Sequence, residues 1–118
     1  MSTKAVWLSR WKRSSLDLTQ PSAELSRMAR QARVLLEGLY FGEGPRWHAG
    51  RLWFSDFYAR HIASVSLGGD KRVELEWDER TSGLGWMPDG SLLFVSMERR
   101  ALFRRWPDGR ISQHADLS

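Results

Sequence analysis

Few side chains in this sequence of 118 residues have the types and spacing that catalysis or metal binding requires. There is no cysteine, which excludes disulfide scaffolds, zinc ribbons and thiol nucleophiles. The three histidines have no histidine partner two or four positions away and no carboxylate at ligand spacing, so no histidine metal site is predicted. We expect His48, His61 and His114 to lie in turns or at the surface.

Serine and aspartate side chains raise the question of a nucleophile. Ser55, Asp56 and Ser64 lie close together in the sequence, but no Gly-x-Ser-x-Gly turn is present to expose a serine for attack. Asp56 is expected to cap the turn that follows its own strand. The sequence therefore predicts no catalytic residue in this chain.

Glu43 is a carboxylate between two glycines, in the run Gly42-Glu43-Gly44-Pro45. The glycines let the backbone bend sharply and leave little side-chain bulk beside the carboxylate. Carboxylate oxygens are hard ligands that suit divalent cations such as Ca²⁺ and Mg²⁺. From these residues alone, however, a solvated glutamate in a turn is the preferred interpretation.

The positive charge is concentrated near the N-terminus. Residues 1–36 carry seven basic and two acidic side chains, whereas residues 37–118 carry 11 basic and 12 acidic ones, so the formal net charge of +4 belongs to the first segment. The basic run 7–13 contains two tryptophans, a combination found in nucleic-acid and membrane contacts and, in an acid-poor setting, in transit peptides. A solvated tail remains the favoured interpretation, and we expect no nucleic-acid partner.

No apolar run approaches the roughly 18 residues that cross a bilayer, so a cytoplasmic protein without a membrane partner is expected. We expect residues 1–33 to be a basic, disordered extension. A short helix is favoured near residues 22–32, where Leu25, Met28, Ala29 and Ala32 share one helical face. Residues 1 to about 27 are expected to stand outside the fold, with Met28 as the start of the parent enzyme.

The second segment, residues 34–118, contains a repeat of about 40 residues. A shift of 40 positions aligns pairs of identical or similar residues: Gly50 with Gly90, Leu52 with Leu92, Phe54 with Phe94, Ile62 with Leu102, and Gly69 with Gly109. Each copy predicts four short strands separated by Gly or Pro-Asp-Gly turns. The first strand of each copy ends at Trp47 or Trp86; the others are expected at 52–55, 61–67 and 73–77, then at 92–95, 101–106 and 111–114.

Four short strands per repeat of this length are typical of a β-propeller blade. In such a fold the large, flat tryptophans fill the wedge between neighbouring blades, and this is the role we expect for them here. Two blades are encoded, whereas a six-bladed ring needs on the order of 240 residues.

The glycine-rich entry and the strand after it resemble a known family. Residues 39–47, Leu-Tyr-Phe-Gly-Glu-Gly-Pro-Arg-Trp, and 48–56, His-Ala-Gly-Arg-Leu-Trp-Phe-Ser-Asp, are similar to the first blade of the senescence marker protein (SMP-30) and gluconolactonase family, the regucalcin-like lactonases. Residues 82–86 and 88–90 are similar to its second blade. The resemblance covers residues 34–118.

This resemblance implies a six-bladed propeller that hydrolyses a sugar lactone or a similar ester with a divalent cation, Ca²⁺, Zn²⁺, Mn²⁺ or Mg²⁺. It assigns Glu43 as a metal ligand. The other implied ligands are an Asn and an Asp from later blades, and no residue of this chain corresponds to them. The family also closes its ring by pairing the N-terminal strand with the last blade, so Val34 to Leu36 is expected to lack a partner in this chain.

The sequence therefore predicts an all-β chain, an incomplete β-propeller made of the first two four-stranded blades of a lactonase-type ring. We expect a truncated fragment that is inactive alone, holds no metal tightly and self-associates through exposed blade faces. The alternative is a non-enzymatic propeller segment that acts as a binding or interaction module, because one architecture serves many functions.

Overall fold

The computed structural model describes residues 3–8 and 32–118. These ranges contain ten strands and no helix, and hence none that is long and apolar enough to cross a membrane. The strands are β1 (Thr3–Leu8), β2 (Ala32–Leu39), β3 (Gly42–His48), β4 (Arg51–Asp56), β5 (His61–Val65), β6 (Lys71–Glu76), β7 (Thr81–Trp86), β8 (Leu92–Ser96), β9 (Ala101–Arg105) and β10 (Ile111–Asp116).

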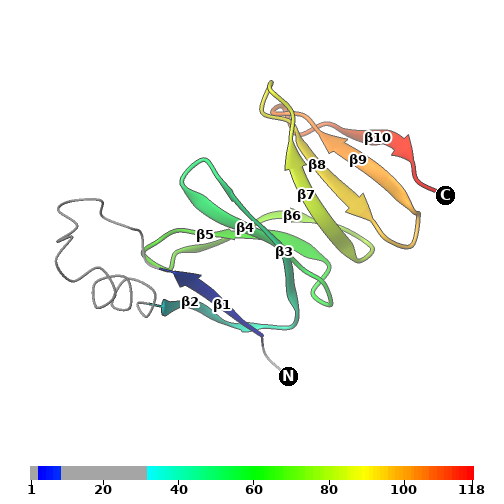
Figure 1. The fold of residues 1–118 in the computed structure, drawn as a ribbon. Coiled ribbons are helices and arrows are strands. Elements are labelled where there is room, and N and C mark those ends of the chain that lie inside the picture. Colours follow the sequence, from blue (N-terminus) through cyan, green and yellow to red (C-terminus); the bar gives the residue numbers. More distant parts are fainter. Residues whose placement is uncertain (1–2, 9–31) are drawn as a thin grey trace, which may run out of the picture.

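Eight of the strands form two antiparallel sheets in chain order, β3-β4-β5-β6 and β7-β8-β9-β10 (Figure 1). The registers of the two sheets repeat with the predicted shift of 40, since Leu52 faces Val65 in the first and Leu92 faces Arg105 in the second. The predicted pair of four-stranded repeats is thereby confirmed.

Tight turns between strands account for this regular meander. Ala49 and Gly50 join β3 to β4 with φ angles of 49° and 76°, a left-handed conformation that glycine adopts without strain. In the second sheet Gly90 has a φ of 85°, and the Asp89 carboxylate accepts the amide proton of Ser91 at 2.9 Å. The predicted turns are thus present at both equivalent positions.

The two sheets pack against each other through strand β7, which lies against β3 and β4. Ile62, Leu84, Leu92 and Phe94 form the buried cluster between the sheets, and Trp53, Trp77 and Trp86 pack against it. This is the wedge position predicted for tryptophan. Trp47 departs from that prediction, because 45% of it is exposed.

The other face of the first sheet is covered by β1 and β2, which pair with each other in a separate two-stranded ribbon. Leu39, Leu52, Phe54, Ala63 and Val65 form a second buried cluster on this face, against which Leu35 and Leu36 of β2 pack. The first sheet is therefore buried on both of its faces.

The β1–β2 ribbon corrects two expectations. Val34 to Leu36 has a partner in this chain, since Val34 faces Val6 and Leu36 faces Ala5 in an antiparallel pair. Thr3–Leu8 consequently belongs to the fold, although residues 1 to about 27 were expected outside it. The surrounding positive charge concealed a short strand-forming run that contains valine and tryptophan. Of the helix expected near 22–32, residues 22–31 lie outside the described residues, and Ala32 begins β2.

Candidate functional site

Glu43 lies near the start of β3, the strand that begins the first sheet. Gly42 faces Asp56 and Glu43 faces Ser55 across the β3–β4 pair, after which the register shifts between Glu43 and Arg46. Gly44, in this irregular stretch, has a φ of 60°. Such a bulge changes the direction of the side chains beside it. The regular pairing that orients Glu43 therefore comes from the residues that precede it.

The entry of β3 lies directly beside the entry of β7. A Cβ atom added to Gly44 would lie 3.8 Å from the Cα atom of Gly83, so the two glycine-rich runs approach closely. The hydroxyl of Ser55 donates to the carbonyl oxygen of Ser82 at 2.9 Å, and the hydroxyl of Thr81 donates to that of Ser55 at 3.2 Å. Glu43 is thus located on the edge along which the two sheets meet.

The Glu43 carboxylate is half-buried and has no hydrogen bond or ion pair with any other residue that the structure describes. Within residues 3–8 and 32–118 no three histidine, aspartate or glutamate side chains are grouped so that they could hold a metal ion. The chemistry of Glu43 fits one oxygen ligand of a hard cation, and the described residues supply no second or third.

Asp56 fixes the loop that leads into β3. Its carboxylate is 2% exposed and accepts the amide proton of Phe41 at 2.8 Å and that of Tyr40 at 3.4 Å. The amide of Phe57 in turn donates to the carbonyl oxygen of Phe41 at 2.8 Å. Asp56 was expected to cap the turn after its own strand; instead it caps the loop before the neighbouring strand, because the β3–β4 pairing brings that loop to its side chain.

His61 is the other titratable group beside Asp56. Its Nε2 atom lies 3.8 Å from Oδ2 of Asp56, too far for a hydrogen bond, and has no hydrogen-bond partner among the described residues. Burial, aided by the charge of Lys71, lowers the pKa of His61. His61 therefore packs as a neutral ring inside the sheet rather than in a turn or at the surface.

An aromatic group borders the same end of β3. The rings of Phe41, Phe57 and Tyr58 meet edge to face, with centroids 5.0 to 5.9 Å apart. The guanidinium of Arg80 lies 5.1 Å from the centre of the Phe57 ring. Tyr58 is 63% exposed, so this aromatic cluster forms part of the surface next to Glu43.

Comparison with known proteins identifies the family. The family model described as the SMP-30/gluconolactonase/LRE-like region matches residues 41–118, which include Glu43 and both four-stranded sheets. The chain belongs to this family. Its two sheets are therefore two blades of an all-β propeller: β3–β6 form the first blade and β7–β10 the second.

A search of solved structures finds similarity to a streptogramin B lyase structure, with 18% sequence identity and a TM-score of 0.49. The match covers 61% of this SMP-30-family chain and 26% of the lyase chain, so it spans about a quarter of that protein. A search of curated proteins finds no match.

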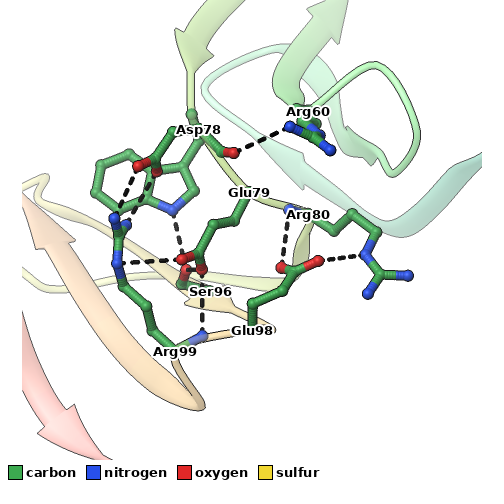
Figure 2. Close-up of polar contacts among 8 residues, drawn as sticks. Arg60, Asp78, Glu79, Arg80, Ser96, Glu98 and Arg99 are labelled. Carbon is green, nitrogen blue, oxygen red and sulfur yellow. Dashed lines mark hydrogen bonds and ion pairs between the residues drawn. The ribbon is translucent and has the colours of Figure 1, made fainter.

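The second blade has its own polar contacts where Asp56 lies in the first (Figure 2). Ser96 ends β8 as Asp56 ends β4, and it is fully buried. The carboxylate of Glu79 accepts the Ser96 hydroxyl and, at 3.2 Å, the amide proton of Arg99; the indole nitrogen of Trp77 donates to the Ser96 oxygen at 2.9 Å. Here the carboxylate comes from the loop and the hydroxyl from the strand, the reverse of the first blade.

Two ion pairs surround these contacts (Figure 2). Arg99 binds Asp78 through two nitrogens, at 3.0 and 2.7 Å, and these hydrogen bonds lower the pKa of Asp78. Arg80 binds Glu98 and lowers the pKa of that carboxyl in the same way. The sequence predicted only solvated charges at Arg99, because the partners lie 21 and 20 positions away in the chain.

The remaining candidates have structural surroundings. Ser64 is buried, donates to the Glu74 carboxylate at 2.5 Å and accepts from the Arg51 guanidinium at 2.7 Å. His48, expected in a turn or at the surface, ends β3 and stacks on Trp86, whereas His114 is exposed as expected. None of these residues joins Glu43 in one site.

Proposed function

We propose that this chain forms the part of a metal-dependent sugar-lactone hydrolase that supplies Glu43 as a ligand of the cation. The observation that carries the proposal is the half-buried Glu43 carboxylate without a partner among the described residues, within the segment that matches the family. A carboxylate in such surroundings is favoured when a cation compensates its charge.

The residues around Glu43 suit this role. Gly44 and Gly83 bring the two blade entries together without side-chain bulk, and the bonds from Asp56 hold the loop before Glu43 in place. The cation, one of Ca²⁺, Mg²⁺, Mn²⁺ or Zn²⁺, would supply Lewis-acid polarisation of the lactone carbonyl when bound. Because the described residues contain one ligand, the chain alone is proposed to be inactive and to bind metal weakly.

A non-enzymatic binding module is the second candidate function. The exposed aromatic cluster of Phe41, Phe57 and Tyr58 favours it, because aromatic faces exposed beside a cation such as Arg80 are typical of contact surfaces. This function needs the cluster and does not need Glu43.

Calorimetric titration with Ca²⁺, Mn²⁺ and Zn²⁺ and an aldonolactone hydrolysis assay separate the two functions. Each is applied to this chain and to a protein in which the remaining blades of a longer family member follow residue 118. We expect turnover only in the extended protein and its loss in the variant Glu43→Gln, whereas Glu76→Gln, a change at an exposed glutamate of β6, leaves it unaltered. An extended protein that folds but hydrolyses no lactone, or is unaffected by Glu43→Gln, would support the binding module.

A further inference from the structure

We propose that Asp56 is a positioning residue for Glu43: its carboxylate fixes the backbone that enters β3 and thereby the direction of the Glu43 side chain. This inference rests on the proposed function of Glu43 as a metal ligand. It assigns to Asp56 a role that acts through the backbone, since Asp56 itself lies one residue beyond Ser55, the cross-strand partner of Glu43.

The hydrogen bonds of Asp56 reach the amides immediately before Glu43. Its Oδ1 atom accepts from Phe41 at 2.8 Å and its Oδ2 atom from Tyr40 at 3.4 Å, two and three residues ahead of Glu43. Hydrogen bonds to an ionised group are about twice as strong as neutral ones. Because the carboxylate is 2% exposed, breaking these bonds would leave a buried charge without compensation, and the loop is therefore held tightly.

The loop has little freedom to adjust. A Cβ atom added to Gly42 would lie 3.0 Å from Cδ1 of Leu39, and the Phe57 amide binds the Phe41 carbonyl at 2.8 Å. After Glu43 the β3–β4 register is irregular until Arg46. The regular, tied side of Glu43 is thus the side that Asp56 holds, and the direction of the Glu43 side chain depends on it.

The second blade provides an internal comparison. At the equivalent place Ser96 binds the side chain of Glu79 instead of backbone amides, and the residue at the position of Glu43 is Ser82, which has no carboxylate. A carboxylate bound directly to the entry backbone therefore occurs in the blade that contains the candidate ligand. This coincidence is expected if Asp56 serves Glu43.

The test uses the full 118-residue chain and Mn²⁺ alone as the probe, because paramagnetic broadening of amide signals reveals even weak metal binding. In the wild-type chain we expect Mn²⁺ to broaden the amide signals of residues 42–44 first. Asp56→Leu should lower the apparent Mn²⁺ affinity at these residues about tenfold, the lower end of the loss seen when a partner of a metal ligand is removed. Asp56→Asn, which keeps an oxygen acceptor for the Phe41 amide, should recover part of that loss.

Ser96→Ala is the matched control, because it removes the equivalent contact in the second blade and should leave broadening at residues 42–44 unchanged. Hydrogen exchange of the Phe41 amide should accelerate in both Asp56 variants while exchange in β8 stays slow. Unchanged broadening at residues 42–44 in a folded Asp56→Leu chain would overturn the positioning role. If that variant does not fold, Asp56→Asn decides the question: a lower Mn²⁺ affinity supports the role, and an unchanged affinity overturns it.

A wild-type chain in which Mn²⁺ leaves residues 42–44 unaffected would overturn the ligand role of Glu43 together with this inference. That result differs from the failure of the inference alone, in which the wild-type and Asp56 variants are broadened equally. The two failures are therefore distinguishable in one set of spectra.

Discussion

The imidazole of His48 stacks on the indole of Trp86, with ring centroids 4.0 Å apart and planes inclined by 9°. His48 ends β3 and Trp86 ends β7, so this contact joins the inner strands of the two blades at the opposite end from Glu43. Trp53 meets the edge of the Trp86 ring at 5.2 Å and donates its indole proton to the His48 carbonyl at 3.2 Å. The three side chains together connect the blades at this end.

Truncation of Trp86 is expected to destabilise the chain. Trp86→Ala removes the stack with His48 and the contact with Trp53, and we expect the free energy of unfolding to fall by about 3 kcal/mol. Urea denaturation measures the change. Trp47→Ala is the matched control, because Trp47 is 45% exposed and its truncation should cost about 1 kcal/mol or less. Equal losses in both variants would contradict the role of Trp86 between the blades.

Acidification is expected to destabilise the fold through His61. Burial, with the charge of Lys71, keeps the pKa of His61 in the folded chain below its ordinary value of 6.5. As the pH falls through that value, the unfolded chain takes up the proton first, so the free energy of unfolding decreases. Urea denaturation at about pH 7.5 and about pH 5.5 tests this difference.

His61→Gln should remove most of this decrease, whereas His114→Gln, at an exposed position, should leave it intact. The lowered pKa values of Asp78 and Glu98 act at more acidic pH, where protonation of these carboxyls removes the stability that their ion pairs contribute. The chosen pH range therefore isolates the histidine. A decrease that persists in His61→Gln would contradict the prediction.

The two surface ion pairs are expected to act independently. Arg99→Ala should return the pKa of Asp78 toward its ordinary value and leave that of Glu98 unchanged, because each carboxyl has its own arginine. Arg80→Ala should have the opposite pattern. NMR titration of the side-chain carboxyl carbons measures both values in each variant. A shift of both pKa values in either variant would show that the four residues titrate as one group.

Removal of β1 is expected to loosen β2. Deletion of residues 1–8 takes away the strand that faces Val34 and Leu36, so their amides should exchange hydrogen faster. The amides of β8, which pairs on both sides within the second blade, should be unaffected. Hydrogen exchange followed by NMR provides the measurement, with β8 as the internal control. Slow exchange at Val34 and Leu36 after the deletion would show that another partner protects them.

The sequence alone was sufficient to predict the two blades. Strand order, turns and even the register are local: each strand pairs with the next through a short turn, and the residues that repeat with a period of 40, such as Leu52 with Leu92, mark equivalent positions. The glycines beside Glu43 likewise identified the candidate ligand, because they are adjacent in the chain and their freedom of conformation is intrinsic.

The contacts that position Glu43 were decided by the tertiary structure. Asp56 is 15 residues from Phe41, and Arg99 is 21 from Asp78; such side-chain bonds form only after the strands have paired, and their geometry leaves no local pattern in the sequence. The same holds for β1, whose partner β2 lies beyond residues 9–31. Local propensities determine which segments become strands, whereas the packing of distant segments decides which polar groups meet once water is excluded between them.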